Sequence, residues 1–237
     1  ESLLELSGNG RVRRVRISAT PNTERGLQIT GQPTLGALEL LVDSSFSVQN
    51  QFSVEEGILV DGVTLTLNDS GTFDSALVLN NGILVITGEP VLSGQLSQSG
   101  ASSIQLQDGA LLTTNQAVGL GSEVLSLEGP GAFANGQPFA LDQAGAGLEL
   151  SGEVTVSGEV KLGAGGFKVS GDAALSGSLG LLDDTTLEVA SGQTLTYSGA
   201  EVSIGQRSLS LEGGGELLNA GALVLDDAQS VVSLAGI

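Results

Sequence analysis

Residues 148–172 read Leu-Glu-Leu-Ser-Gly-Glu, Val-Thr-Val-Ser-Gly-Glu, Val-Lys-Leu-Gly-Ala-Gly-Gly and Phe-Lys-Val-Ser-Gly-Asp. In each unit one apolar residue lies on each side of a middle residue, and a glycine-containing turn follows. Because alternate side chains of a strand point to opposite faces, the two apolar side chains of a unit share one face. Glycine accepts the positive φ that a tight corner requires. The pattern therefore predicts short strands joined by corners.

This triplet of an apolar residue, any residue and a second apolar residue recurs along the whole chain, and it is most regular over residues 148–182. Other examples are Leu4/Leu6, Val15/Ile17, Leu27/Ile29, Phe46/Val48, Leu84/Ile86, Leu125/Leu127, Leu195/Tyr197, Leu209/Leu211 and Val232/Leu234. Longer stretches such as 128–137 are expected to be loops inserted between repeats. No comparable helical period appears. We therefore predict one continuous domain over residues 1–237.

A strand that buries only two side chains needs a similar strand directly above and below it, and a coil of parallel strands supplies both. Three short strands in a turn of roughly 20–25 residues give an all-β, single parallel β-helix (a β-solenoid) of about ten turns and roughly 5 nm. The alternative is an antiparallel β-sandwich, whose hairpins favour Asn-Gly and Asp-Gly turns. Asp61-Gly62, Asn81-Gly82 and Asp108-Gly109 keep this alternative open.

Composition and charge exclude several classes of function. The chain has no Cys, His, Met or Trp and carries a formal charge of −19. Without Cys or His there is no disulfide, no Ser-His or Cys-His nucleophile and no ordinary zinc site. An acidic surface repels nucleic acid and anionic lipid, and no run of about 18 apolar residues predicts membrane insertion. We expect no cofactor and no specific metal site, although loose binding of divalent cations stays open.

The repeat units at 148–172, together with Thr-Leu-Glu-Val-Ala-Ser-Gly-Gln from Thr186, resemble the repeats of right-handed β-helical bacterial surface proteins. Autotransporter passengers and filamentous-haemagglutinin-like adhesins are of this kind. The resemblance covers most of the chain, but it rests on the style of the repeats and transfers no functional residue. It implies secretion, a rod shape and a role in adhesion or scaffolding, with a host or matrix receptor as a possible partner.

Parallel β-helices also include polysaccharide lyases and glycosidases, so carboxylates and lysines need attention. Adjacent carboxylates point to different sides of a strand or turn and do not face each other across a cleft; they occur at Glu55-Glu56, Asp183-Asp184 and Asp226-Asp227. Lys161 and Lys168 are one repeat apart and are expected on different faces. We therefore predict that the chain is not an enzyme. A groove lined by several carboxylates and by Lys161, Lys168 or Arg207 would favour the alternative, a protein that binds or cleaves carbohydrate.

The two ends of the predicted rod are apolar and have no recognisable cap. Leu4 and Leu6 lie near one end, and Val232 and Leu234 lie near the other. An uncovered end of a solenoid presents unpaired backbone donors and acceptors. We expect copies of the chain, or adjoining segments of a larger surface protein, to stack end to end there. Guanidinium groups suit carboxylate partners, and those of Arg11, Arg13, Arg14 and Arg16 are expected to contact acidic residues of the next unit.

These observations predict a non-enzymatic, extracellular structural protein, either a filament subunit or the stalk segment of a surface adhesin. The sequence has no initiator Met and no signal peptide. We interpret this as a processed or trimmed chain, for which removal of a secretion signal is the simplest event.

Overall fold

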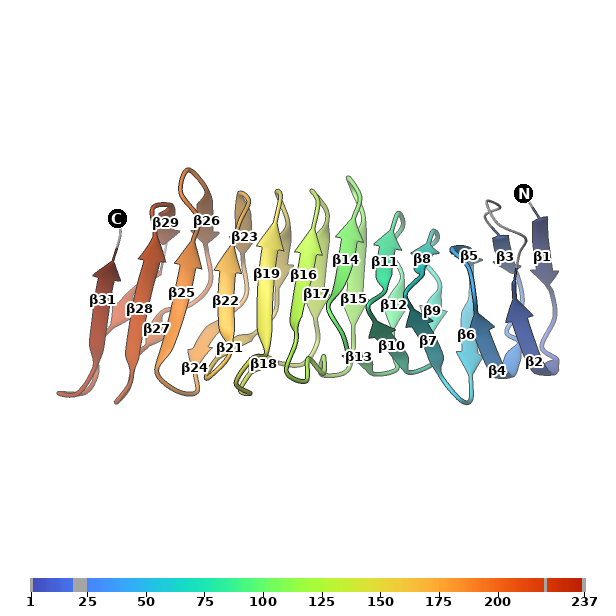
Figure 1. Ribbon diagram of the computed structural model, residues 1–237, viewed down its shortest axis with the longest axis horizontal. Coiled ribbons are helices and arrows are strands. Elements are labelled where there is room, and N and C mark those ends of the chain that lie inside the picture. Colours follow the sequence, from blue (N-terminus) through green and yellow to red (C-terminus); the bar gives the residue numbers. More distant parts are fainter. Residues whose placement is uncertain (1, 19–24, 220, 236–237) are drawn as a thin grey trace.

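The computed structural model describes residues 2–18, 25–219 and 221–235. These residues form 31 strands and no helix, and the pairings among them are parallel. The strands stack as a β-solenoid of about 11 turns (Figure 1). The predicted fold class is therefore confirmed, and the antiparallel sandwich is wrong.

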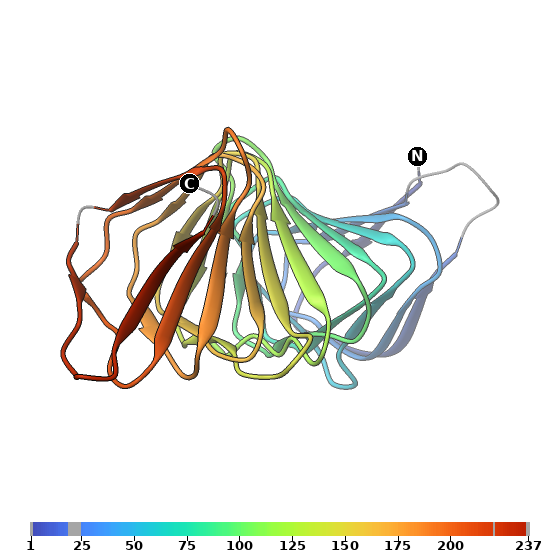
Figure 2. The same ribbon diagram turned by 60° about the vertical axis from the view of Figure 1, so that its left-hand side comes forward.

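Three walls surround the interior of the rod, and the first wall is a single twelve-stranded ladder. In Figure 1 its strands stand side by side along the length of the rod, and Figure 2 shows the turns as loops around one shared interior. Its members are β1 (Ser2–Leu6), β3 (Arg25–Ile29), β5 (Ser44–Val48), β8 (Thr64–Leu67), β11 (Ile83–Ile86), β14 (Ser102–Leu106), β16 (Val124–Glu128), β19 (Gly147–Ser151), β22 (Gly166–Val169), β25 (Thr185–Val189), β28 (Ser208–Gly213) and β31 (Val231–Ala235).

The second and third walls are built from shorter strands. The second wall contains β6 (Gln51–Val54), β9 (Thr72–Phe73), β12 (Val91–Leu92), β15 (Leu111–Thr114), β17 (Ala132–Asn135), β20 (Thr155–Ser157), β23 (Ala173–Leu175), β26 (Thr194–Tyr197) and β29 (Glu216–Asn219). The third wall contains β7 (Ile58–Asp61), β10 (Leu77–Asn80), β13 (Leu96–Gln98), β18 (Phe139–Leu141), β21 (Val160–Leu162), β24 (Leu179–Leu181), β27 (Val202–Ser203) and β30 (Leu223–Val224).

Two longer strands at the N-terminal end of the rod take the place of a second-wall and a third-wall strand. They are β2 (Arg11–Ile17) and β4 (Thr34–Leu40). β4 pairs with β2 on one side and with both β6 and β7 on the other. In the following turns a corner divides this side of the rod into the two separate walls.

The apolar triplets point inward along the described part of the rod, as the sequence predicts. Leu148 and Leu150 are buried, while Glu149 between them is more exposed. Val154 and Val156 are fully buried in the next wall. Neighbouring turns place like residues side by side, because Leu148 pairs with Leu125 on one side and with Phe167 on the other. The interior is therefore a set of apolar columns that run along the rod.

The length of a turn varies while the columns stay aligned. From Leu27 to its partner Phe46 the chain advances 19 residues, and from Leu187 to Leu211 it advances 24. Corners absorb the difference. The stretch 128–137, which the sequence predicts as a loop, contains β17 with Phe133 fully buried. That prediction was wrong because the second inward residue of β17 is Asn135, so the strand lacks the usual apolar pair.

The corners depend on glycine where one turn lies directly on the next. At Gly177 an added Cβ would stand 1.5 Å from the carbonyl oxygen of Gly158, which is far inside contact distance. Asn81, by contrast, adopts φ 50° immediately before Gly82, which is a corner conformation open to Asn. The Asn-Gly and Asp-Gly steps that suggested hairpins therefore form corners of a parallel coil.

One inward position of the third wall carries an amide in place of an aliphatic side chain. Gln98 stands in a column with Val60 and Leu79 on one side, and the Ser97–Gly119 bridge places Leu120 on the other. Gln98 is 6% exposed, and neither polar atom of its amide has a hydrogen-bond partner among the described residues. An unpartnered buried polar group costs about 1–3 kcal/mol. The regular third-wall strands are also interrupted here, between β13 and β18.

The assignment of inward residues is tested by Val156→Asp. We expect a loss of at least about 3 kcal/mol in the free energy of unfolding, because an unpaired charge would lie in an apolar column. The control Thr155→Asp places the same group on the outward face of the same strand and should change stability by less than about 1 kcal/mol. Urea unfolding followed by circular dichroism measures both. Equal effects of the two substitutions would contradict the inward assignment.

Candidate functional site

The N-terminal end of the rod exposes residues that are interior in every following turn. β1 stands last in the first wall, so only one of its edges is paired among the described strands, and the same holds for β2. Leu4 is 45% exposed and Leu6 is half-buried, whereas Leu27 and Ile29 of the next turn are fully buried. The end therefore combines a free backbone edge with an uncovered apolar row.

The C-terminal end has the same character on all three walls. Leu234 is 65% exposed and Leu225 is 59% exposed, although both continue inward columns. Val232 and Leu223 are half-buried. β29, β30 and β31 are the last strands of their ladders, and each has one unpaired edge among the described residues. The two ends thus place Leu4, Leu6, Val232 and Leu234 where the sequence predicts them.

The four arginines of β2 differ in their surroundings. Arg11 forms an ion pair with Glu55, and Arg16 Nε lies 3.3 Å from Glu39 Oε2. Both partners belong to the following turns of the same molecule. Arg13 and Arg14 are exposed and form no ion pair with any described residue. They are therefore the two arginines of β2 whose charge is not already paired in the described part of the chain.

From the sequence alone, all four arginines are expected to contact the next unit. The structure instead pairs Arg11 with Glu55 and Arg16 with Glu39 within one molecule. A signal was present in the spacing. Glu39 follows Arg16 by 23 residues, which is one turn of this solenoid, and Glu55 follows Arg11 by 44 residues, which is two turns. These spacings predict the two ion pairs only when the number of residues in a turn is known.

Opposite charges characterise the two ends. Beyond Arg207 the chain contains no Lys or Arg, while it contains Glu212, Glu216, Asp226 and Asp227. Asp226 accepts hydrogen bonds from the Ser203 hydroxyl and from the Gly205 backbone N–H, the latter at 2.7 Å. These bonds hold the pKa of Asp226 below its ordinary value of 3.8. The arginine end therefore has an acidic counterpart at the far end of the rod.

The adjacent carboxylates bind groups of their own chain and do not face each other across a cleft. Asp184 Oδ1 accepts the Ser208 backbone N–H at 2.7 Å, one turn further along. Asp227 accepts from Gln206 Nε2 at 3.1 Å and from the Gln229 N–H at 2.9 Å. A glycosidase needs two opposed carboxyl groups on either side of a sugar. These pairs instead tie successive corners together.

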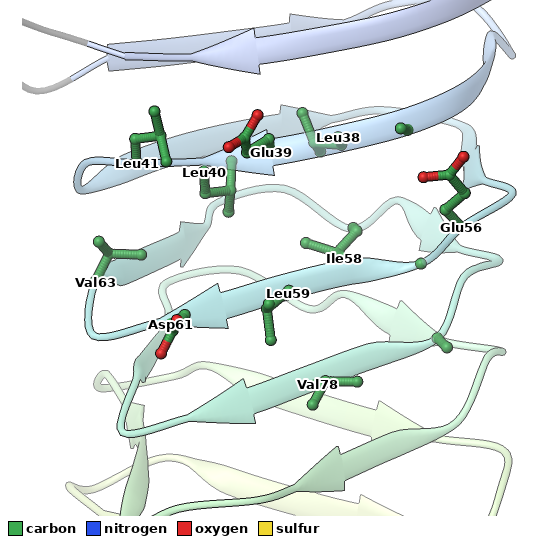
Figure 3. A pocket seen from close by; sticks show the side chains of 13 residues that line it. Leu38, Glu39, Leu40, Leu41, Glu56, Ile58, Leu59, Asp61, Val63 and Val78 are labelled. Atoms are coloured by element: carbon green, nitrogen blue, oxygen red, sulfur yellow. The ribbon is translucent and has the colours of Figure 1, made fainter.

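A groove on the third wall lies where β4 and β7 diverge (Figure 3). The two strands pair only at Leu38–Ile58 and Glu39–Leu59, whereas β7 and β10 pair along four residues. The groove has a volume of about 460 Å³, and the exposed side chains of Leu41 and Leu59 contribute to its lining. Figure 3 shows Glu56 and Asp61 near opposite ends of it.

A second groove lies on the outer face of the first wall, over β19, β22 and β25. Gly147 and Gly166 are neighbours in the ladder, and both lack a side chain there. Beside them Glu149, Lys168 and Glu188 form one row across three turns, with Lys168 Nζ 3.9 Å from Glu149 Oε1. Lys161 lies in β21 on the third wall, so the two lysines are on different faces, as expected. This is the groove that best meets the condition stated for a carbohydrate site.

The described residues contain no cluster of three or more acidic, His or Cys side chains arranged to hold a metal ion. They also include no helix with the length and apolarity needed to cross a bilayer. Comparison of the chain with models of protein families, with curated proteins and with solved structures gives no match. The two open ends are therefore the candidate functional site, on geometry alone.

The hydrogen bonds of Asp226 predict a dependence on pH. Its pKa is lower in the folded chain than in the unfolded chain, so the stability it contributes is present at neutral pH and is lost as pH falls below 3.8. Asp226→Asn should therefore loosen the last turn at pH 7, and its difference from the unaltered chain should shrink as pH falls below 3.8. Limited proteolysis of residues 200–235 measures this.

The control is Glu201→Gln, which removes an exposed carboxylate from the same part of the rod without removing these hydrogen bonds. It should leave the cleavage rate at pH 7 close to that of the unaltered chain. If Asp226→Asn and Glu201→Gln behaved alike at pH 7, Asp226 would not tie the last two turns together.

Proposed function

We propose that this chain is a non-enzymatic structural protein of the cell exterior, a rod that is extended by strand addition at its two ends. The observation that carries the proposal is the uncovered apolar row at each end, where Leu4 and Leu234 are 45% and 65% exposed. These rows continue the buried columns of the rod. A further turn, from a second copy or from an adjoining segment of a longer chain, would bury them and pair the free edges.

The mechanical properties of the rod suit this role. Its stability comes from backbone ladders and from columns of Leu, Val, Ile and Phe, because the chain has no Cys and hence no disulfides. Between Gly26 and Val160 there is no Lys or Arg, so enzymes that cleave after basic residues have few sites. The hydrogen-bonded ladders and the scarcity of basic residues both favour resistance to proteolysis.

The finer assignment is a filament subunit or the stalk segment of an adhesin on a bacterial surface. It draws on the repeat style shared with autotransporter passengers and filamentous-haemagglutinin-like adhesins, and the parallel solenoid supports it at the level of the fold. Under this proposal the chain is secreted, and its partners are copies of itself, adjoining segments and a host or matrix receptor. Nucleic acid, membrane insertion and cofactors have no part in it.

The alternative hypothesis is binding or cleavage of carbohydrate, for which the first-wall groove is the best location. Glu149, Lys168 and Glu188 supply polar groups there. The buried aromatic rings favour the structural role, however. Tyr197 is 2% exposed, and the Phe side chains lie in the interior, so no aromatic platform for a sugar ring is formed from the described residues.

The proposal predicts the behaviour of a charge reversal at the N-terminal end. Arg13→Glu with Arg14→Glu should raise the protein concentration needed for end-to-end assembly by about tenfold or more, because both guanidiniums are lost and two repulsive carboxylates replace them. Sedimentation velocity and electron microscopy at low and high salt measure the assembly of the unaltered chain and of the variant.

The matched control is Lys161→Glu with Lys168→Glu, which makes the same change of charge in the middle of the rod. Its two ion pairs are surface pairs and contribute little to stability. It should assemble like the unaltered chain. Single rods of the unaltered chain at high concentration and at every salt concentration would defeat the filament subunit and leave the segment of a surface adhesin as the better account.

A further inference from the structure

The chain lacks the two residues whose side chains are oxidised most readily, because it contains no Cys and no Met. Asparagine followed by glycine offers a different route to chemical change. The side-chain amide of the asparagine reacts with the next backbone nitrogen, and glycine leaves that nitrogen flexible and uncrowded. The sequence contains three such steps, at Asn9-Gly10, Asn81-Gly82 and Asn135-Gly136. The rod gives each of them different surroundings.

Deamidation at such a step needs no enzyme and no reagent except water. The glycine backbone nitrogen attacks the side-chain carbonyl carbon, Cγ, of the asparagine. The new N–Cγ bond forms, the Cγ–Nδ2 bond breaks, and ammonia leaves with the proton that the glycine N–H gives up. Water then opens the resulting succinimide ring at one of its two carbonyl carbons. The product is aspartate, or isoaspartate, in which the backbone runs through the former side chain.

The attacking nitrogen is bound to a different degree at each of the three steps. The Gly136 N–H donates to the Thr114 carbonyl oxygen at 2.7 Å, and the Gly82 N–H donates to Ser102 Oγ at 3.4 Å. The Gly10 N–H has no hydrogen-bond acceptor among the described residues. Gly10 is also exposed, whereas Gly82 is buried. The nitrogen of Gly10 is therefore the one that is free to attack.

The side-chain amides, whose nitrogen is lost as ammonia, follow the same order. Asn135 is 7% exposed, and its Nδ2 donates to two carbonyl oxygens, at 2.9 and 2.8 Å. Asn81 Nδ2 donates to Asn80 Oδ1 at 3.4 Å. Asn9 is exposed, and its Oδ1 accepts the Gln32 backbone N–H at 3.2 Å. That donor lies at the oxygen on which negative charge develops when Cγ is attacked, so it favours the reaction.

We propose that Asn9 is a site of spontaneous deamidation in the folded rod, and that the fold protects Asn81 and, most strongly, Asn135. The inference does not depend on the proposed function. The corner that contains Asn9 packs directly on the next turn, where a Cβ added at Gly31 would lie 2.0 Å from the Gly8 carbonyl oxygen. Isoaspartate lengthens the backbone of this corner by one carbon. The corner should therefore loosen as the protein ages.

Incubation of the protein at mildly alkaline pH, followed by peptide mass spectrometry, measures all three steps in one sample. In the folded chain Asn9 should deamidate at least about tenfold faster than Asn81 or Asn135, because bound and misplaced reacting groups lose at least that much rate. In denaturant the three steps should react at similar rates, because the protection is lost. Equal rates in the folded chain, or a faster reaction at Asn81 or Asn135, would overturn the proposal.

The matched control is Gly10→Ala. A Cβ added at Gly10 meets no atom within 4 Å, and the φ of Gly10 lies outside the left-handed region, so the rod should accept alanine there. The new methyl group crowds the attacking nitrogen and should slow deamidation of Asn9 at least about tenfold. The urea midpoint should stay unchanged. An unchanged rate at Asn9 would overturn the cyclic route. The same change at Gly82 would not serve, because its Cβ would lie 2.6 Å from the Val60 carbonyl oxygen.

Trypsin measures the effect on the corner, because it cuts after the arginines of β2 once that strand leaves its partner. Aged protein should be cut there faster than fresh protein. Gly10→Ala that has been aged in the same way should be cut like fresh protein. Equal cleavage of fresh protein and of protein fully deamidated at Asn9 would overturn the loosening of the corner.

Discussion

The stacking of each strand on similar strands above and below it is the interaction on which the rest of this structure depends. A strand such as β20 or β21 has three residues and buries only one or two side chains, which is too little to stabilise it alone. The neighbouring turns provide the missing contacts, so stability is close to a sum over nearest neighbours. The middle of the rod has two neighbours everywhere, and the terminal turns have one. We therefore expect the terminal turns of the described rod to be its least stable part, and the proposed assembly would supply the missing neighbour there.

The same constraint explains the position of the charges. Inward columns exclude charge, and most carboxylates lie at the corners, where several tie one turn to the next. Asp43 accepts the backbone N–H of Thr64, and Asp172 accepts that of Thr194, each from the following turn. Asp226 binds Gly205 of the preceding turn in the same way. The acidic composition therefore has a structural role at the corners.

Sequence periodicity was enough to predict the solenoid and most of its inward residues, because an apolar triplet has one buried face in any strand. It failed where one of the two inward residues of a strand is polar. Asn135 takes an inward position of β17, and Gln98 and Thr114 do so in β13 and β15, so the apolar pair is incomplete in each strand. The exposure of Leu4 and Leu234 follows from their place in the first and last strands of the described first wall, so it could be predicted. The partners of Arg11 and Arg16 could not, because they depend on the number of residues in a turn, which the irregular corners conceal.

Hydrogen–deuterium exchange of single rods, at a dilution where sedimentation shows no assembly, tests the dependence on stacking most directly. Exchange reports local opening, and a solenoid held by neighbouring turns should open from its ends. The account predicts the strongest protection in the central strands β14 to β22, with a progressive decrease toward β2 and toward β29. Terminal turns as strongly protected as the centre would contradict it, because the ends would then be stable without a neighbour.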